Sequence, residues 1–557
     1  MNTVMLLLIW LLPLALALLA RQRHARWLII VAALPALIAA TVLPVGTHVS
    51  LPWLLLGVEL GLDETGRVFL LFSGLLWLLA SLVAVGSLMG DANSTRFRFF
   101  FLLAMSGNLG LIVAQDMVSF YLGFTLMGLA AYGLIAHSAS LRARRAARRY
   151  LGWTIAGELI LFVAITMLAQ QHGGDLSFSV LQSAPPASFV VLLLIIGFGI
   201  KLALPGLHLW LPQSYAVAPT AAVMVLSGAM IKAGLLGWLR FLPPGDVSLI
   251  DWGELLMVIG IIGIGFGAVF GLMQQRPRLL LGYSSISKMG VLTAGMGAAL
   301  SWPAAAPAII SALVIFAAHH ALVKAALFLG LGLVERGGLR PWLWPGFVFL
   351  ALALAGAPFT SGALAKSMLS ASLPQAAHQL LGLLALSAFV TTLLMARFLF
   401  LLWRLRERAT TPHAVASTVA WLVLLEMIVV WPVMLADPGQ LHAGIVPLSL
   451  GVLLAALALT ATKRWPGIIS FHNRRFTGRY LARQTSRGNL YLSCAAQLFI
   501  SSMLSTLRKR YELILLILKR SQRASQPAQN SEHEWPLAGT LWLCIGGMLL
   551  AAFAATA

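Results

Sequence analysis

The segment FAAHHALVKAALFLGLG (316–332) places Lys324 inside a long apolar run. Three further apolar runs each contain one lysine: IIGFGIKLALPG (195–206) with Lys201, VLSGAMIKAGLL (225–236) with Lys232, and GAPFTSGALAKSMLSAS (356–372) with Lys366. A charged side chain at bilayer depth costs several kcal/mol, so such residues are rare and usually serve proton or ion movement. These four lysines therefore predict an ion pathway inside a membrane protein.

The composition of the 557 residues supports a membrane location. Hydrophobic residues make up 60% of the chain, charged residues only 10%, and the mean hydropathy is +0.91. Because a helix needs about 20 residues to cross a bilayer, we predict an all-α polytopic membrane protein with about sixteen spans, the longer ones broken. The approximate spans are 3–20, 27–47, 67–89, 98–115, 117–137, 151–169, 187–204, 216–242, 253–274, 279–299, 305–334, 344–370, 377–404, 415–435, 440–461 and 537–556.

The first run, MNTVMLLLIW, lacks a basic start and a small-residue cleavage site, so we expect a first helix and not a removed signal. Basic residues fall in alternate loops, and Lys and Arg in short loops stay cytoplasmic. This pattern predicts that both termini lie on the outer, periplasmic face. The basic loops contain Arg21, Arg23 and Arg26; Arg96 and Arg98; the run LRARRAARRY (141–150); Arg276 and Arg278; Arg336 and Arg340; Arg404, Arg406 and Arg408; and Lys463 and Arg464.

The net charge of +21 follows from these loops and a basic tail, without nucleic-acid binding; the excess favours anionic lipid headgroups. The two cysteines, Cys494 and Cys544, form no ligand cluster, and no P-loop or GxGxxG motif occurs in a strand-to-helix context. We therefore expect no cofactor, no metal site and no nucleotide hydrolysis. The energy source must then be an ion gradient or a partner subunit.

The C-terminal part has a different composition. Residues 465–523 are basic and mix apolar runs with the sequence RKRYE, which is typical of an interfacial amphipathic helix on the cytoplasmic surface. A loosely attached linker is the alternative. Residues 537–556 are predicted to make the last crossing.

Several ionisable residues in the spans are candidates for an ion pathway. Glu158 lies in the sixth span, and pairing with Lys201 would make it a charge switch, the alternative being a structural ion pair. Lys232 follows Pro219 by thirteen residues, which on a helix corresponds to about 20 Å and places it near mid-membrane.

The pair His320 and Lys324 shares one helix face at i, i+4 spacing, and a neutral imidazole can relay protons. The alternative is a hydrogen-bonded core histidine. Lys366 follows GAPFTSG, whose glycines and proline should interrupt the helix. Irregular backbone at that depth is tolerated where it lines a hydrated cavity.

Four motifs carry a family resemblance. KLALPGLHLWLPQSYAVAPTAAVMVLSGAMIKAG (201–234), LLLGYSSISKMG (279–290), HHALVKAALFLGLG (319–332) and LAGAPFTSGALAKSML (354–369) resemble the signatures of the antiporter-like, proton-conducting membrane subunits. Members of that family occur in complex I, membrane-bound hydrogenases and multisubunit sodium/proton antiporters. The resemblance covers roughly residues 100–370.

The resemblance implies two inverted five-helix repeats, at 98–242 and 253–404, with broken helices at the spans that hold Lys201 and Lys366. They would follow N-terminal helices (1–97) and precede further helices (415–461). By motif position, Lys201 is similar to the central lysine of the first half-channel and Lys232 to the bridging lysine. His320 and Lys324 match the central relay, and Lys366 matches the terminal lysine.

The chain departs from the family pattern in three places. In the fifth span it reads FTLMGLAAY where the family has WExxSxxSY, so Thr125 stands at the position of the glutamate that partners the central lysine. Glu158 is the nearest candidate substitute. Arg278 stands where a lysine is common, and Lys288 replaces a histidine or glutamine.

The sequence thus predicts a proton-translocating subunit of a multisubunit complex, with a partner that has a cytoplasmic part. The complex could be a redox-driven quinone oxidoreductase or hydrogenase, a sodium/proton antiporter, or a proton-driven bicarbonate or carbon dioxide uptake system. A non-transporting scaffold is the remaining alternative. We expect the complex in the inner membrane of a prokaryote.

Overall fold

The computed structural model describes residues 2–20, 25–54, 57–88, 90–183, 185–243, 249–405 and 414–435 of the chain. All of them belong to the first of two compact units, Met1–Thr460. The predictions for 440–461, 465–523 and 537–556 lie outside the described residues.

The described part is built mainly of helices, with one small antiparallel sheet. Its longer elements are α1 (Asn2–Leu18), α2 (Ala25–Val31), α3 (Leu34–Val42), β1 (Thr47–Leu51), β2 (Val58–Leu62), α4 (Glu64–Ser87), α5 (Ser94–Val113), α6 (Met117–Ile135), α7 (Leu141–Gln171), α9 (Ser188–Leu202), α10 (Leu211–Val217), α11 (Thr220–Gly228), α12 (Ala233–Phe241), α13 (Ile250–Leu272), α14 (Pro277–Ser301), α15 (Ala306–Gly337), α16 (Leu343–Ala355), α17 (Ser361–Ser372), α18 (His378–Trp403) and α19 (Val415–Leu435). Short α8 (Val180–Ser183) and the 3₁₀ turns η1 (Met230–Lys232), η3 (Pro303–Ala305) and η4 (Gln375–Ala377) complete the order.

The fourteen spans predicted between residues 3 and 435 each fall on one or more of these helices. Eight helical segments in the described part are long and apolar enough to cross a membrane, and five shorter ones are apolar. The chain is therefore a multi-pass membrane protein, and the total of sixteen spans stays a prediction.

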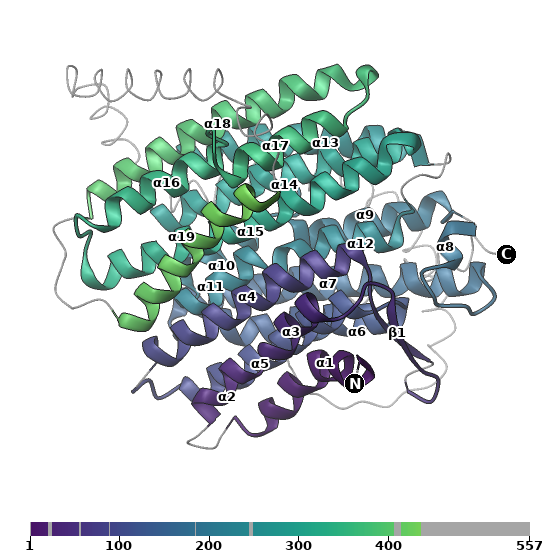
Figure 1. Ribbon diagram of the computed structural model, residues 1–557, viewed down its shortest axis with the longest axis horizontal. Coiled ribbons are helices and arrows are strands. Elements are labelled where there is room, and N and C mark those ends of the chain that lie inside the picture. Colours follow the sequence, from purple (N-terminus) through teal and green to yellow (C-terminus); the bar gives the residue numbers. More distant parts are fainter. Residues whose placement is uncertain are drawn as a thin grey trace, which may run out of the picture. The chain divides into compact units, whose positions relative to one another are not determined.

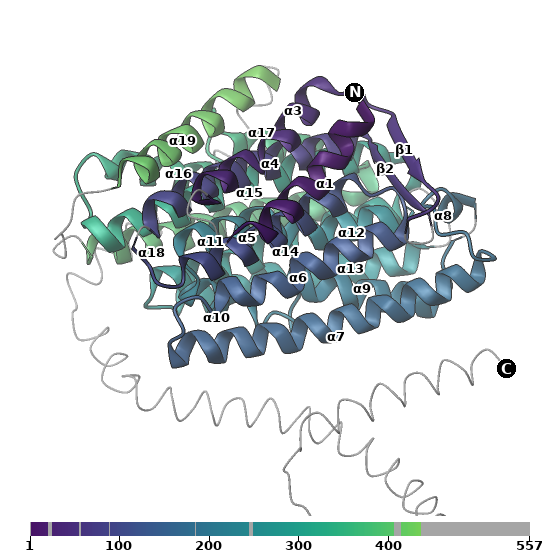
Figure 2. The same ribbon diagram turned by 90° about the horizontal axis from the view of Figure 1, so that it is seen from below.

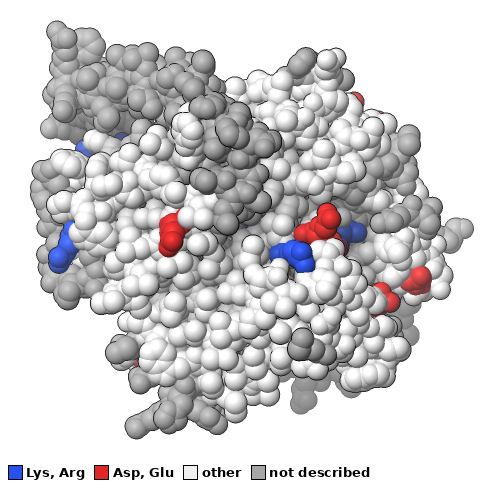
Figure 3. Space-filling model, viewed as in Figure 1, with Lys and Arg blue, Asp and Glu red and all other residues white. Residues whose placement is uncertain are grey.

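Most of the helices run roughly parallel or antiparallel to one another (Figures 1 and 2). The N-terminal helices α1–α3, in purple, and helices α16 and α18, in green, lie on opposite sides in Figure 1, with α10, α11 and α15 between them. Helix α7 runs along the lower edge of the coloured helices in Figure 2. Basic and acidic side chains occupy few places on the face drawn in Figure 3, as expected of a surface that meets lipid.

Three local features differ from the sequence-based expectation. Strands β1 and β2 form a hairpin in register Thr47↔Leu62, so the fold is not purely helical. The predicted span 27–47 is divided between α2 and α3. The arginine run is not a loop but the start of α7, because Ser140 caps the helix by accepting from the Ala143 amide, and Ala, Leu and Arg favour helix.

Helices α13 and α14 pack backbone to backbone through glycine. A Cβ on Gly267 would lie 2.4 Å from the Ser287 amide nitrogen, and one on Gly290 would lie 2.6 Å from the Gly260 carbonyl oxygen. Only glycine permits such an approach. This contact fixes the turn of α14 that carries Lys288.

Helix breaks occur next to the membrane lysines. Helix α9 ends at Leu202, directly after Lys201, where Ala203 adopts φ 57°. Between α11 and α12, η1 ends at Lys232. Helix α16 ends before Gly356 (φ 84°), Phe359 has φ 60°, and α17 then carries Lys366. The breaks near Lys201 and Lys366 agree with the resemblance, whereas the position of the break at Lys232 was not predicted.

Candidate functional site: a row of buried ionisable residues

The first polar group lies between α6 and α7. Thr125 donates a hydrogen bond of 2.5 Å to Glu158 Oε2, while Glu158 Oε1 is buried without a hydrogen-bond partner. Glu158 is 5% exposed. The Glu158 carboxyl group, which comes from α7, therefore reaches Thr125 on α6, the position at which the resemblance expects a glutamate.

Lys201 approaches the same place from α9. A Cβ on Gly128 would lie 2.8 Å from Glu158 Oε1 and 3.7 Å from Lys201 Nζ, so both groups lie against this glycine. Lys201 donates to the Tyr150 hydroxyl at 3.3 Å and faces the rings of Phe124 and Tyr150. Within the described residues, Glu158 and Lys201 are neighbours without a direct ion pair.

Lys232 is fully buried at the break between α11 and α12. Its ammonium donates to the Ser227 carbonyl at 2.6 Å. The 3₁₀ turn at Met230–Lys232 interrupts the α-helical hydrogen bonding there, and such a turn inside a helix often marks a functional hinge.

Helix α15 supplies the centre of the row. Lys324 donates to the Leu281 carbonyl at 2.9 Å, and His319 Nδ1 shares a hydrogen bond of 2.8 Å with the Ser361 hydroxyl. Both ring nitrogens of His320 are buried without a hydrogen-bond partner among the described protein atoms. His320 is thus not a hydrogen-bonded core histidine in the described structure.

Lys366 and Lys288 form the far end. Lys366 donates to the Ala355 carbonyl, the last residue of α16, so its ammonium lies at the helix break. Lys288 on α14 donates to the Ser387 hydroxyl of α18 at 3.3 Å. Lys288 lies close enough to Lys324 and Lys366 for both charges to act on it.

These side chains form two electrostatically linked sets. Glu158 and Lys201 make the first, and the second contains Lys232, His319, His320, Lys324, Lys288 and Lys366. Between the sets, Tyr150 accepts a hydrogen bond from Lys201, and the Tyr215 hydroxyl donates to the Leu226 carbonyl at 3.2 Å, next to the Ser227 carbonyl that binds Lys232. The two sets together are called the buried row below.

Sequence reasoning placed Glu158, Lys201, Lys232, His320, Lys324 and Lys366 in the site, and the structure brings all six into the buried row. The sequence-based site did not include Lys288, His319 or Tyr150. The motif SSISKMG could have suggested Lys288, since a lysine in a predicted span carries the same energetic argument as the other four. Tyr150 carried no comparable signal.

Two cavities open at opposite ends of α4. One of about 720 Å³ lies at its start, beside β1 and β2, and includes Asp63 and Arg240. Arg240 donates to both carboxylate oxygens of Asp63, at 2.6 and 3.0 Å. Burial raises the pKa of Asp63, but the Arg240 charge and hydrogen bonds, with the Gly66 amide, outweigh it and hold the pKa below its ordinary value. The other cavity, at the end of α4, is about 530 Å³ and is lined by residues of the basic loops.

The ordered motifs and this geometry agree with a family comparison. A family model described as NADH:quinone oxidoreductase/Mrp antiporter, TM, matches residues 114–394, just over half of the chain. The chain belongs to this family. Every member of the buried row lies within the matched residues.

Among relatives in the family, the chain is 30% identical over 304 residues to NAD(P)H-quinone oxidoreductase chain 4 2 of Microcystis aeruginosa, covering 52% of this chain and 53% of the relative. It is 29% identical over 353 residues to NADH-quinone oxidoreductase subunit M of Escherichia coli, covering 58% and 67%. The chain thus matches between about half and two thirds of the length of these relatives. The fold resembles a chain of the Mrp complex from Dietzia sp. DQ12-45-1b, with a TM-score of 0.70, 23% identity and coverage of 96% of this chain and 64% of that one.

Proposed function

We propose that this chain is a proton-conducting subunit that moves protons along the buried row and couples this movement to a partner subunit. The observation that carries the proposal is the buried row itself. Lys232, His320 and Lys324 are each fully buried, and no carboxylate forms an ion pair with any of them in the described part of the chain. Burying ionisable side chains without a charged partner is costly for folding, so we attribute their presence to function.

Electrostatic coupling supplies the mechanism. Two unit charges about 6 Å apart interact by roughly 3 kcal/mol at an effective dielectric of about 20, enough to shift a pKa by about two units. A proton arriving at Lys324 therefore favours proton release from Lys232 or Lys288. In the first half, release from Lys201 would accompany protonation of Glu158, which Thr125 and Gly128 keep beside it.

The transported ion is a proton and not sodium in this proposal. Hard cations prefer several oxygen ligands, whereas Lys201, Lys232, Lys288, Lys324 and Lys366 present ammonium groups that repel a cation. Lysine and histidine instead bind and release protons. Glu158 is the one carboxylate in the buried row.

We further propose that residues 98–242 and 253–404 are the two inverted repeats, each contributing a half-channel. Helices α6 to α12 and α14 to α18 fall within these ranges, and α5 and α13 begin shortly before them. Each set contains a break next to a lysine, after Lys201 and before Lys366. Both termini are placed on the outer face of a prokaryotic inner membrane, because the arginine-rich ends would then face the cytoplasm.

The partner must supply what the buried row lacks. The described residues offer proton-binding groups, so the reaction that drives proton movement, or that uses it, is assigned to another subunit, which we place partly in the cytoplasm. A redox-driven complex is favoured by the quinone oxidoreductase relatives, and an antiporter by the likeness to the Mrp complex. A proton-driven bicarbonate or carbon dioxide uptake system is the third possibility, and a non-transporting scaffold is the alternative outside transport.

The test is to purify the complex that copurifies with the full chain, identify its subunits, and reconstitute it in liposomes with a pH-sensitive dye. We expect proton flux driven by a membrane potential, and no electrogenic ²²Na⁺ uptake in the same vesicles. Flux equal to that of protein-free liposomes, in a complex with all its subunits, would favour the scaffold.

A further inference from the structure

A cavity of about 530 Å³ opens at the arginine-rich end of the helices. It lies where α4, α10 and α15 end and where α11 and α14 begin, so several elements that carry the buried row meet around it. Its lining includes Ser87, Ser138, Thr220, Arg276, Arg278 and Glu335.

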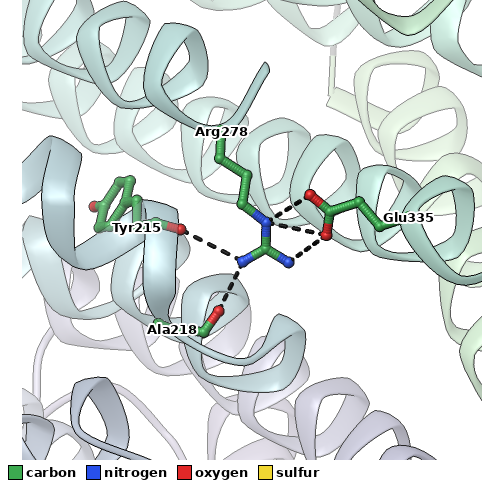
Figure 4. Close-up of polar contacts among 4 residues, drawn as sticks. All are labelled: Tyr215, Ala218, Arg278 and Glu335. Carbon is green, nitrogen blue, oxygen red and sulfur yellow. Dashed lines mark hydrogen bonds and ion pairs between the residues drawn. The ribbon is translucent and has the colours of Figure 1, made fainter. Parts of the chain in front are cut away.

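Arg278 joins three of these elements (Figure 4). Its guanidinium donates to both Glu335 oxygens, with the shortest distance 2.6 Å, and to the carbonyls of Ala218 at 2.7 Å and Tyr215 at 3.5 Å. The contact with Glu335 holds α14 against α15, and the carbonyl contacts hold α14 against the end of α10. One side chain thus closes the junction of three elements.

The junction lies close to two lysines of the buried row. Leu281 follows Arg278 by one helical turn, and its carbonyl accepts the hydrogen bond from Lys324. Tyr215, whose carbonyl binds Arg278, sends its hydroxyl to Leu226, the residue before the Ser227 carbonyl that binds Lys232. The carbonyl that binds the Lys324 ammonium therefore lies one turn of α14 from the residue that carries the guanidinium.

The solvent exposure of the Arg278–Glu335 ion pair is consistent with a contact that opens and closes. The side chain of Glu335 is 37% exposed and that of Arg278 is 16% exposed. An ion pair with this much solvent contact stabilises by about 1 kcal/mol or less, so thermal motion separates it often. The guanidinium keeps its contacts with the α10 carbonyls when Glu335 leaves, and a path between α14 and α15 can then open.

We propose that the Arg278–Glu335 pair is the gate of a water entrance through which Lys324 exchanges protons with the arginine-rich face. The inference rests on the proposed function, since it names where protons enter the buried row. It assigns Arg278 and Glu335 a positioning role: neither relays the proton, and both control whether water from the cavity reaches Leu281 and Lys324.

The test measures access to Leu281 without any transport assay. In full-length protein with Cys494→Ser and Cys544→Ser, Leu281→Cys is labelled by a charged methanethiosulfonate reagent added to the arginine-rich face. Glu335→Gln, which removes the charge, should raise the labelling rate about fivefold, corresponding to about 1 kcal/mol, the upper value for a partly exposed pair.

Two controls make the result specific. Asp63→Asn removes the charge of a second bidentate arginine–carboxylate pair of the described residues, at the opposite end of α4, and should leave the labelling rate of Leu281→Cys unchanged. Thr220→Cys lines the cavity itself and should be labelled at the same rate with or without Glu335. If Glu335→Gln does not fold, Glu335→Asp, which keeps the charge but shortens the reach, should give a smaller increase.

Equal labelling of Leu281→Cys with Glu335 and with its Gln and Asp replacements would overturn the gate. An equal rise with Asp63→Asn would also overturn it, because loosening of the whole structure would then explain the access. A failure of the proposed function would be seen in a different experiment. Proton flux would then be unchanged after replacement of Lys324, independently of the labelling result.

Discussion

The hydroxyl group of Thr125 on α6 donates a 2.5 Å hydrogen bond to the carboxyl group of Glu158 on α7. By the motif resemblance, Thr125 stands at the position of the family's glutamate, and here its hydroxyl binds a carboxyl group from the adjacent helix. Lys201 has an acidic neighbour, Glu158, beside Gly128, although the expected motif is missing. The relationship between these two residues underlies the first prediction.

Replacing Thr125 by valine should slow proton flux about tenfold. The exchange keeps the shape and removes a hydrogen bond to an ionisable group, worth about 1.5–3 kcal/mol, and each 1.4 kcal/mol corresponds to a factor of about ten. Thr125→Ser, which keeps the hydroxyl, serves as the matched control and should retain most of the flux. Equal flux for the valine and serine variants in liposomes would show that the hydrogen bond has no part in conduction.

Replacing Lys366 by methionine should abolish proton flux, because the ammonium at the break between α16 and α17 would be lost. Lys366→Arg keeps a positive charge that stays protonated in proteins. If Lys366 must release its proton, the arginine variant should be as inactive as the methionine variant while inserting normally. An active arginine variant would mean that only the positive charge matters, and would argue against proton release at this residue.

Replacing Gly267 by alanine should destabilise the protein by about 1–3 kcal/mol, the usual cost of overpacking. The added Cβ would lie 2.4 Å from the Ser287 amide and force α13 away from α14. Gly265 on the same helix meets nothing within 4 Å, so Gly265→Ala should leave the stability unchanged or raise it. Thermal unfolding in detergent checks both variants, and a midpoint that falls equally for the two would contradict the packing account.

The ion pair between Asp63 and Arg240 should make the stability depend on acid pH. The folded pKa of Asp63 lies below its ordinary value of 3.8, so the pair's contribution is present above that pH and is lost as the pH falls through the folded pKa. The unfolding midpoint of the natural chain should therefore drop more steeply below about pH 4 than that of Asp63→Asn. Parallel pH profiles for the two proteins would indicate that the pair contributes nothing measurable.

Much of the fold could be predicted because bilayer spans must be long and apolar. The four lysines were identified from their cost in the membrane, and the two breaks near Lys201 and Lys366 from glycine, proline and motif position. The β1–β2 hairpin was missed because its strands, THVSL and VELGL, are only five residues each and lie in the connection between two predicted spans. The arginine run was assigned to a loop by its charge, although alanine and arginine favour the helix that begins after Ser140.

The site was harder to predict where it depends on contacts between helices. Neither the hydroxyl contact of Thr125 nor the link from Lys288 to Ser387 has a local sequence pattern, since the partners lie 33 and 99 residues apart. The ion pair of Arg278 with Glu335 joins residues 57 positions apart and is equally invisible in one sequence. Such contacts can be identified only when the packing of the helices is known.

The central claim is that protons move along the buried row, and proton flux after replacement of Lys324 by methionine tests it most directly. The complex is reconstituted in liposomes, a potassium diffusion potential drives the flux, and a pH-sensitive dye reports it. Thr392→Val is the control, because Thr392 is a buried polar residue of α18 whose hydroxyl, among the described residues, donates to the Ala388 carbonyl of its own helix. The account predicts that Lys324→Met reduces the flux to the level of protein-free liposomes while Thr392→Val retains it. Full flux in assembled Lys324→Met complex would contradict conduction along the buried row.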